Sequence, residues 1–159
     1  MSRKYKIRDQ ERLYFVTFTV IEWIDLFSRQ VYRDIFLDSL RFCQTNKGLD
    51  LCAYCIMSSH AHLILGRSGD QKLEDIIRDI KKFTSVKIIQ TIKELQEESR
   101  RNFLIHHFSK AGNSNPNNSM YQVWQQHNHP IELNTEDKIN RCLNYIHRNP
   151  VEAGIVLSP

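Results

Sequence analysis

Two histidines separated by one residue are the first groups in this sequence that could do chemistry. His60 and His62 open the apolar run HAHLIL, which is typical of a strand. Side chains at positions i and i+2 of a strand point to the same face, so both imidazoles can reach one ion. Neutral imidazole binds divalent metals, and two such ligands leave room for a third protein group, waters and a phosphate. The pattern indicates a metal site with open positions.

A tyrosine and an asparagine four residues apart could supply a nucleophile and a further ligand. Tyr145 and Asn149 lie in NYIHRNPVEAG, and residues four apart share one face of a helix. Pro150 is predicted to end this helix, which places Asn149 at the negative end of the helix dipole, where a cation is favoured. The same dipole disfavours a tyrosinate, so a metal or a general base must activate Tyr145. The alternative is an ordinary helix residue followed by a C-cap.

Two cysteines offer a second interpretation of the histidines. Cys52 and Cys55 precede His60 and His62, and this set resembles the ligands of a structural zinc site. Residues three apart in a regular strand point to opposite faces, so the thiols could share an ion only across a bulge or a turn. This geometry favours buried thiols over zinc.

The elements that must position these groups follow from the apolar pattern. The predicted strands are residues 13–21, 51–57, 61–65, 121–124 and 131–133. The predicted helices are residues 29–48 after an N-cap at Ser28, residues 72–98, and residues 136–149 after a cap at Asn134 or Thr135. Residues 112–119, GNSNPNNS, are predicted to be an exposed loop. This order predicts an α+β fold, a ferredoxin-like split βαβ with an antiparallel sheet and an extra C-terminal helix that carries Tyr145.

Composition limits the class of protein. The 159 residues are 41% hydrophobic and 25% charged, as in a globular domain without membrane spans. The basic N-terminus has no apolar segment behind it, so we expect a cytoplasmic protein with reduced cysteines. A net charge of +4 permits a nucleic acid partner.

Two motifs resemble one family. HAHLIL with the downstream YIHRNPVEAGIV resembles the REP-associated tyrosine transposases, a branch of the His-hydrophobic-His (HUH) single-strand transposase family. WQQHNHPIEL, which begins at Trp124, is similar to the segment before the tyrosine helix of that branch, and the similarity runs from about residue 13 to residue 156.

The resemblance implies a role for each matched residue. His60 and His62 match the paired metal ligands, Tyr145 matches the nucleophile, and Asn149 matches the position of the third ligand. The implied cofactor is Mg²⁺ or Mn²⁺. The implied reaction is nicking and strand transfer at a hairpin of single-stranded DNA, through a 5′-phosphotyrosine that leaves a free 3′-OH. Members of the branch continue past this point, so we expect residues 1–159 to be a single transposase domain that lacks a C-terminal extension.

DNA contacts are predicted on basic and aromatic side chains. We expect cationic side chains to follow phosphates and an aromatic ring to stack an unpaired base. The candidates are Arg78, Lys81 and Lys82 on the long helix, with Trp124 and Arg148. The expected partner is single-stranded hairpin DNA, bound by a monomer or a homodimer.

Two other functions stay open from the residues alone. A hairpin-DNA-binding module of the same fold without nicking activity would bind equally well with chelator present. A zinc-stabilised interaction domain would hold stoichiometric zinc and unfold on chelation.

Overall fold

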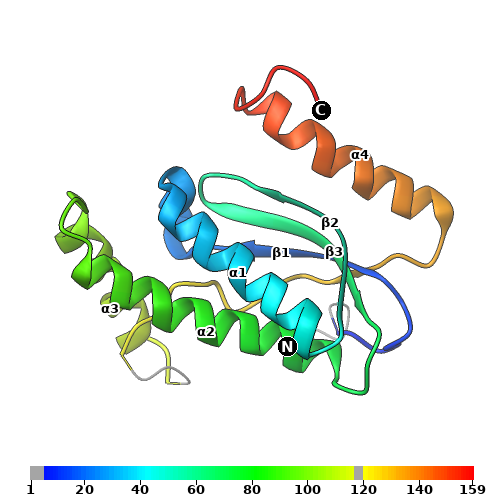
Figure 1. Cartoon of the computed structure of the whole chain (residues 1–159), viewed down its shortest axis with the longest axis horizontal. Helices are drawn as coiled ribbons and strands as arrows, with labels where there is room; N and C mark the ends of the chain where they lie inside the picture. Colours follow the sequence, from blue (N-terminus) through cyan, green and yellow to red (C-terminus); the bar gives the residue numbers. More distant parts are fainter. Residues whose placement is uncertain (1–5, 117–119) are drawn as a thin grey trace.

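One antiparallel sheet organises the chain. The computed structural model describes residues 6–116 and 120–159. The strands β1 (Tyr14–Thr19), β2 (Leu49–Ile56), β3 (His60–Arg67) and β4 (Ile131–Glu132) form a sheet in the order β2-β3-β1-β4 (Figure 1). β3 lies between β1 and β2, so the helix that connects β1 to β2 crosses over a strand. This is the predicted ferredoxin-like split βαβ arrangement.

Helices cover the two faces of the sheet unequally. α1 (Gln30–Asn46) and α2 (Leu73–Glu94) pack on one face, α3 (Arg101–Asn113) packs against α2, and α4 (Glu136–Glu152) lies on the other face (Figure 1). Between β1 and α1 the chain makes two short 3-10 turns, Ile21–Trp23 and Leu26–Ser28. None of the helices in the part of the chain that the structure describes is long and apolar enough to cross a membrane.

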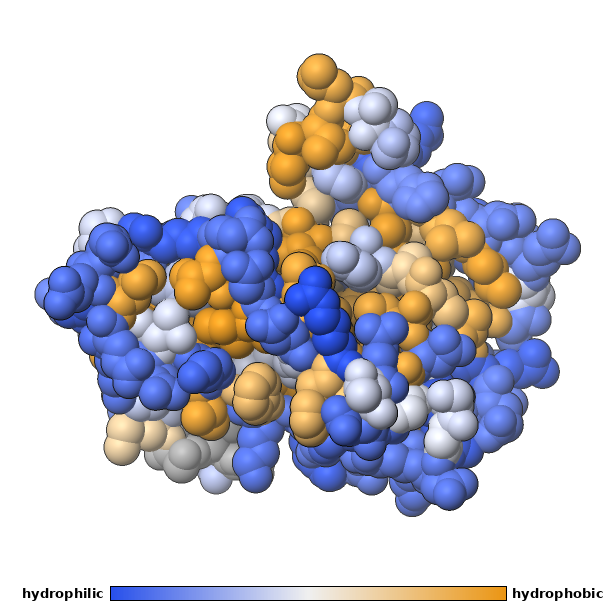
Figure 2. All heavy atoms as spheres, viewed as in Figure 1, coloured by the Kyte–Doolittle hydropathy of each residue, from blue (hydrophilic) through white to orange (hydrophobic). Residues whose placement is uncertain are grey.

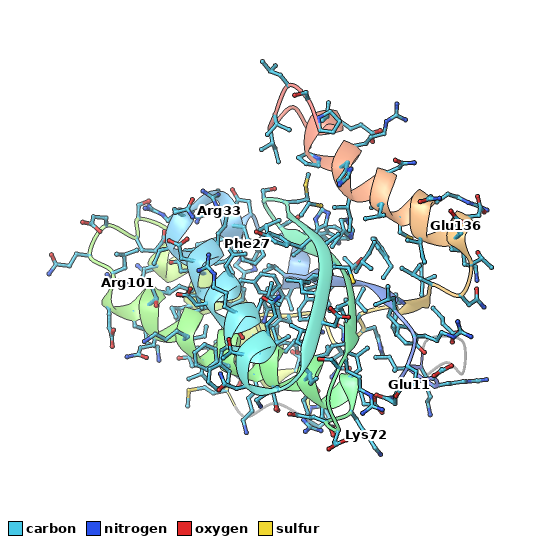
Figure 3. The ribbon with its side chains drawn as sticks, turned by 45° about the vertical axis from the view of Figure 1, so that its right-hand side comes forward. Glu11, Phe27, Arg33, Lys72, Arg101 and Glu136 are labelled. Atoms are coloured by element: carbon cyan, nitrogen blue, oxygen red, sulfur yellow. The ribbon has the colours of Figure 1, made fainter. Side chains whose placement is uncertain are left out.

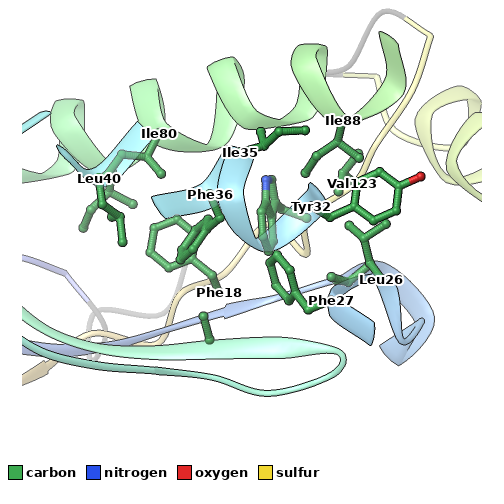
Figure 4. Close-up of a cluster of buried hydrophobic side chains, with 14 of the residues drawn as sticks. Phe18, Leu26, Phe27, Tyr32, Ile35, Phe36, Leu40, Ile80, Ile88 and Val123 are labelled. Atoms are coloured by element: carbon green, nitrogen blue, oxygen red, sulfur yellow. The ribbon is translucent and has the colours of Figure 1, made fainter. Parts of the chain in front are cut away.

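Strand alternation divides the apolar residues between two cores. Ala61, Leu63 and Leu65 of β3 point toward α1 and α2, where Phe18, Phe36 and Ile80 also meet (Figure 4). Ile64 of β3 and Phe15 of β1 point the other way, into a smaller cluster under α4 with Met57, Leu133 and Ile146. Because successive strand residues alternate in direction, His60 and His62 must point toward α4.

Two predicted elements differ from the structure. Residues 101–113 form α3, which the sequence did not predict, because its buried stripe is narrow and consists of Leu104, Phe108 and Gly112. The predicted strand at 121–124 is only a single bridge between Val20 and Trp124. The predicted loop at 112–119 is shorter at its start, since Gly112 and Asn113 close α3, and residues 117–119 lie outside the described residues.

The ends of three helices also differ. α2 ends at Glu94, four residues before the predicted end. α1 begins at Gln30 with Arg29 as N-cap, because the Ser28 hydroxyl donates to the carbonyl of Asp25 instead. α4 is capped by Thr135, as predicted, but it continues through Pro150 to Glu152. Proline removes one donor without changing the helical φ, and the carbonyl of Asn149 still accepts from the amide of Ala153 at 3.0 Å.

Candidate metal and tyrosine site

The two histidines meet on the α4 face of β3. Their ring centroids lie 4.8 Å apart with planes inclined at 74°. Thr17 and Thr19 stand opposite His62 and His60 in the β1–β3 register. The alternation of the strand therefore brings the imidazoles together as the sequence predicted.

His62 is held so that one ring nitrogen has no protein partner. Its Nδ1 lies 2.9 Å from the Thr17 hydroxyl, its ring stacks on Phe15 at 5.3 Å, and its Nε2 is buried without a hydrogen-bond partner. Burial, together with the charge of His60, lowers the pKa of His62 to about 4. The imidazole is therefore neutral at pH 7, and the tautomer that donates from Nδ1 to Thr17 leaves a lone pair on Nε2.

His60 lies at the rim of the same site. Its Nδ1 contacts the Ser59 hydroxyl at 3.1 Å, and burial lowers its pKa. The ring of Trp23 approaches it edge-on, with centroids 5.3 Å apart. His60 is thus a second neutral imidazole, nearer to solvent than His62.

α4 places Tyr145 beside the histidines. The Tyr145 ring lies 5.0 Å from the ring of His62 and 5.9 Å from that of Phe15, and 48% of the residue is exposed. Ile146, the next residue, is buried in the cluster with Phe15 and Ile64 and holds the helix on the sheet. Figure 3 shows α4 from Glu136 onward crossing this face. A tyrosine from the C-terminal helix and two imidazoles from β3 therefore share one site.

Asn149, the predicted third ligand, lies four residues after Tyr145 on α4, and its environment differs from the prediction. Its Nδ2 is buried without a partner. The amide oxygen and nitrogen exchange places on a half-turn of the side chain, so the same position suits an oxygen ligand. The carbonyl of Asn149 itself is not free, contrary to the prediction, because α4 continues and this carbonyl accepts from the amide of Ala153. The helix dipole therefore ends beyond this residue.

Two neutral imidazoles and an amide fit a divalent metal. In the described ranges, no group of three or more His, Cys, Asp or Glu side chains could hold a metal, so an ion bound by the two histidines would need any third protein ligand to be of another type. Cys52 is exposed beside a bulge of β2, whereas Cys55 is buried opposite His62. The cysteines and histidines therefore do not form the structural zinc site.

The predicted DNA-binding residues are not brought together. Arg78 and Lys82 are exposed on α2, in the layer on the opposite side of the sheet from the histidines. Arg148 is exposed on α4 and so lies in the layer of the site.

Two of these residues have partners within the protein instead. Trp124 is only 4% exposed, packs on Phe18 and Phe36 and donates its Nε1 proton to the Thr84 hydroxyl at 2.9 Å, so it offers no free face to a base. Lys81 donates to the carbonyl of Gln125 at 2.6 Å, and burial lowers its pKa to about 8. Its ammonium therefore already donates within the protein.

Sequence reasoning missed three residues of the site. Thr17 and Phe15 contact His62 from β1, and Trp23 contacts His60 from the turn after it. Alternation along β1 would have placed Phe15 and Thr17 on one face, but only the β1–β3 register pairs them with His62.

The family follows from a sequence match that includes both histidines. A model of the IS200-like transposases matches residues 13–111. This is more than half of the chain, and the protein therefore belongs to the IS200-like transposase family. Family membership makes it a DNA-processing enzyme. The match ends before α4, so it does not include Tyr145 or Asn149.

Solved structures show the same fold. A REP-associated tyrosine transposase bound to a REP hairpin matches with a TM-score of 0.62 and 18% identity, over 98% of this chain and 76% of that one. A crystal structure described as a putative transposase from Deinococcus radiodurans R1 matches with a TM-score of 0.55 and 18% identity, over 92% of this chain and 94% of that one. No curated protein matches the sequence.

Proposed function

We propose that this transposase nicks and transfers single strands of DNA in a metal-dependent reaction, with Tyr145 as nucleophile. The observation that supports this most directly is the pair of buried, unpartnered polar atoms, His62 Nε2 on β3 and Asn149 Nδ2 on α4, the helix that carries Tyr145. Leaving a polar group buried and unpaired costs about 1–3 kcal/mol. A ligand that engages both side chains would remove this cost.

The proposed ligand is Mg²⁺ or Mn²⁺, held by His60, His62 and Asn149. When bound, such an ion supplies Lewis-acid stabilisation of charge on the oxygens of the scissile phosphate. Both imidazoles are neutral and ready to bind at pH 7, since burial lowers the pKa of each. Asn149 adds no negative charge, so we expect weak affinity in the absence of DNA.

The residues of this chain then carry the strand exchange. The phenol oxygen of Tyr145 forms a bond to phosphorus while the bond from phosphorus to the 3′ oxygen breaks. The phenol proton is transferred overall to that 3′ oxygen, which leaves as a 3′-OH, and the 5′ phosphate remains on Tyr145. One phosphate ester replaces another, so attack by a 3′-OH can rejoin strands without ATP.

The proposed substrate is hairpin DNA with an unpaired flank. One solved neighbour is bound to a REP hairpin, and membership of the family supports a DNA partner here. We expect Arg148 to contact phosphates near the site, since it is exposed on the helix that carries Tyr145. Arg78 and Lys82, on the other layer, would contact only DNA that passes around the edge of the sheet.

Formation of a covalent adduct between the protein and DNA tests the proposed function. Hairpin DNA labelled on the 5′ or the 3′ side is incubated with the protein and Mn²⁺ and run on a denaturing protein gel. We expect a labelled adduct that requires metal, retains the label on the 3′ side of the nick, and disappears in Tyr145→Phe. Tyr54→Phe is the matched control, since Tyr54 is a similarly exposed tyrosine, 47%, on β2.

Two results would contradict the proposed function. Tight binding that persists with chelator, without an adduct over a broad hairpin library, would indicate a DNA-binding module without nicking activity. An adduct that survives Tyr145→Phe would assign the nucleophile to another residue.

A further inference from the structure

The turn after β1 contains two consecutive residues with left-handed backbone. Glu22 has φ 54° and Trp23 has φ 56°. Side chains other than glycine rarely adopt this conformation, because the Cβ atom crowds the backbone. The turn is nevertheless held firmly, since Ile21 and Ile24 on either side are buried and Trp23 donates its amide proton to the carbonyl of Val20 at 3.1 Å. The surrounding structure thus enforces a costly conformation.

This conformation exposes a tryptophan at the rim of the metal and tyrosine site. Trp23 is 59% exposed and meets the ring of His60 edge-on, at 5.3 Å and 76°. Nothing about the core requires an indole there, because the turn is anchored by its aliphatic neighbours. A side chain other than glycine on a left-handed backbone costs stability, and such strain is concentrated at functional positions.

The two acidic side chains near Trp23 in the sequence each have a partner in the protein. The Glu22 carboxylate contacts His107 Nδ1 at 2.5 Å, and the Asp25 carboxylate accepts from Arg100 at 2.8 Å. Both acidic neighbours are therefore turned to cationic or proton-donating partners. The indole is left as the group that a bound molecule would meet next to His60.

We propose that Trp23 is a stacking platform for one unpaired nucleobase beside the scissile phosphate. The proposal rests on the proposed function, because it takes the phosphate to lie at the histidines. A base is one sugar away from its own phosphate, and a flat π surface stacks any base without reading its edges. Trp23 would thereby fix which phosphate lies next to Tyr145, and so the position of the nick.

Fluorescence tests the stacking without requiring any nicking. The chain has two tryptophans, and Trp124 is buried, so DNA-induced quenching reports on Trp23. The probe is a DNA hairpin with a single-stranded flank, titrated into the Tyr145→Phe protein. We expect quenching that is lost when one particular flank nucleotide is replaced by an abasic site. Equal quenching with every abasic position would overturn the proposal.

Substitution tests the consequence for the reaction. We expect Trp23→Ala to slow adduct formation about tenfold, the effect of losing one base stack, and Trp23→Phe to stay within about threefold of wild type. In Trp23→Ala the critical abasic site should add no further loss, and nicks should spread to neighbouring phosphates. Phe42→Ala is the control, because Phe42 is equally exposed, 57%, but lies on α1 across the sheet.

Stability separates a functional role from a structural one. We expect Trp23→Gly to raise the melting temperature by about 2 °C or more, since glycine tolerates this φ, while weakening the flank-dependent binding about tenfold. A Trp23→Gly protein that is destabilised would make Trp23 a structural residue. A normal adduct with unchanged nick position in Trp23→Ala would overturn the stacking proposal while leaving the nickase in place.

Discussion

Thr17 determines which nitrogen of His62 faces the site. Its hydroxyl contacts Nδ1 at 2.9 Å from the neighbouring strand, and this contact leaves Nε2 as the nitrogen without a partner. We expect Thr17→Val to weaken Mn²⁺ binding about 10- to 100-fold, the usual cost of losing a partner that orients a ligand. Calorimetric titration with Mn²⁺ measures this. Thr45→Val, at an exposed position on α1, should bind as the wild type does; equal affinity in Thr17→Val would show that Thr17 does not orient the ligand.

Buried His62 makes the metal-free protein sensitive to acid. Its pKa is about 4 in the folded chain and 6.5 ordinarily, so the unfolded state binds the proton first as pH falls. The stability contributed by neutral His62 is full above pH 6.5 and is lost as pH falls toward 4, by about 3 kcal/mol. Urea unfolding at several pH values measures this, with His62→Gln as reference so that other groups cancel. Parallel pH profiles for the two proteins would contradict the assignment.

Among the helices and strands, the sequence predicted those that bury a broad apolar face. β1, α1, the β2–β3 hairpin and α2 each bury a broad face, and their periodicity was sufficient. α3 buries a stripe only one residue wide per turn, among polar neighbours, and was missed. The end of α4 was misplaced because Pro150 was expected to stop the helix, whereas it removes only one donor near the final turn.

The site was predictable only where a local rule sufficed. The i, i+2 rule joined His60 to His62, and the family motif added Tyr145 and Asn149. The places of Lys81 and Trp124 could not be predicted, because helix spacing identifies a polar face without showing that residues 124–126 cover it. Contacts between segments distant in sequence carry this information, and a single sequence does not display them.

α3 depends on a close approach that only glycine permits. A Cβ added at Gly112 would lie 2.5 Å from the carbonyl oxygen of Met120 and 2.7 Å from Cα of Tyr121, both backbone atoms. We expect Gly112→Ala to lower the free energy of unfolding by about 2 kcal/mol, because backbone must move to relieve the overlap. Gly69→Ala, where the added Cβ makes only an ordinary contact at 3.7 Å, serves as control in the same urea titration. Equal urea midpoints for Gly112→Ala and Gly69→Ala would show that the segment after α3 can move aside without loss of stability.

At the scale of the whole molecule, the two layers are held with unequal strength. Ile146 is the one fully buried side chain of α4, whereas α1 and α2 are buried in a large core (Figure 4). After α4 the exposed Ile155, Val156 and Leu157 form the apolar group at the top of Figure 2. α4 should therefore open as a unit more readily than the rest of the fold.

We expect Ile146→Ala to release α4 before the rest of the chain unfolds. Truncating a buried isoleucine lowers the free energy of unfolding by about 2–5 kcal/mol. Here the lost contacts all belong to the small cluster under α4. Hydrogen exchange should show lost protection in residues 136–152 with β1 and β3 still protected, together with loss of the covalent adduct. Leu143→Ala, at a half-buried position of the same helix, should have a smaller effect. Uniform loss of protection would mean that α4 is not an independent unit.

The β1–β3 register has one more consequence, for the tolerance of this gene to insertions and deletions. The alternation that sends Ala61, Leu63 and Leu65 into the large core sends His60 and His62 to the opposite face. A slip of one residue would expose the apolar set and bury both imidazoles under α1 and α2. Such a slip would therefore disrupt the core and the site together. A chain that folds cooperatively around this core has its histidines on the side of the sheet where α4 carries the tyrosine.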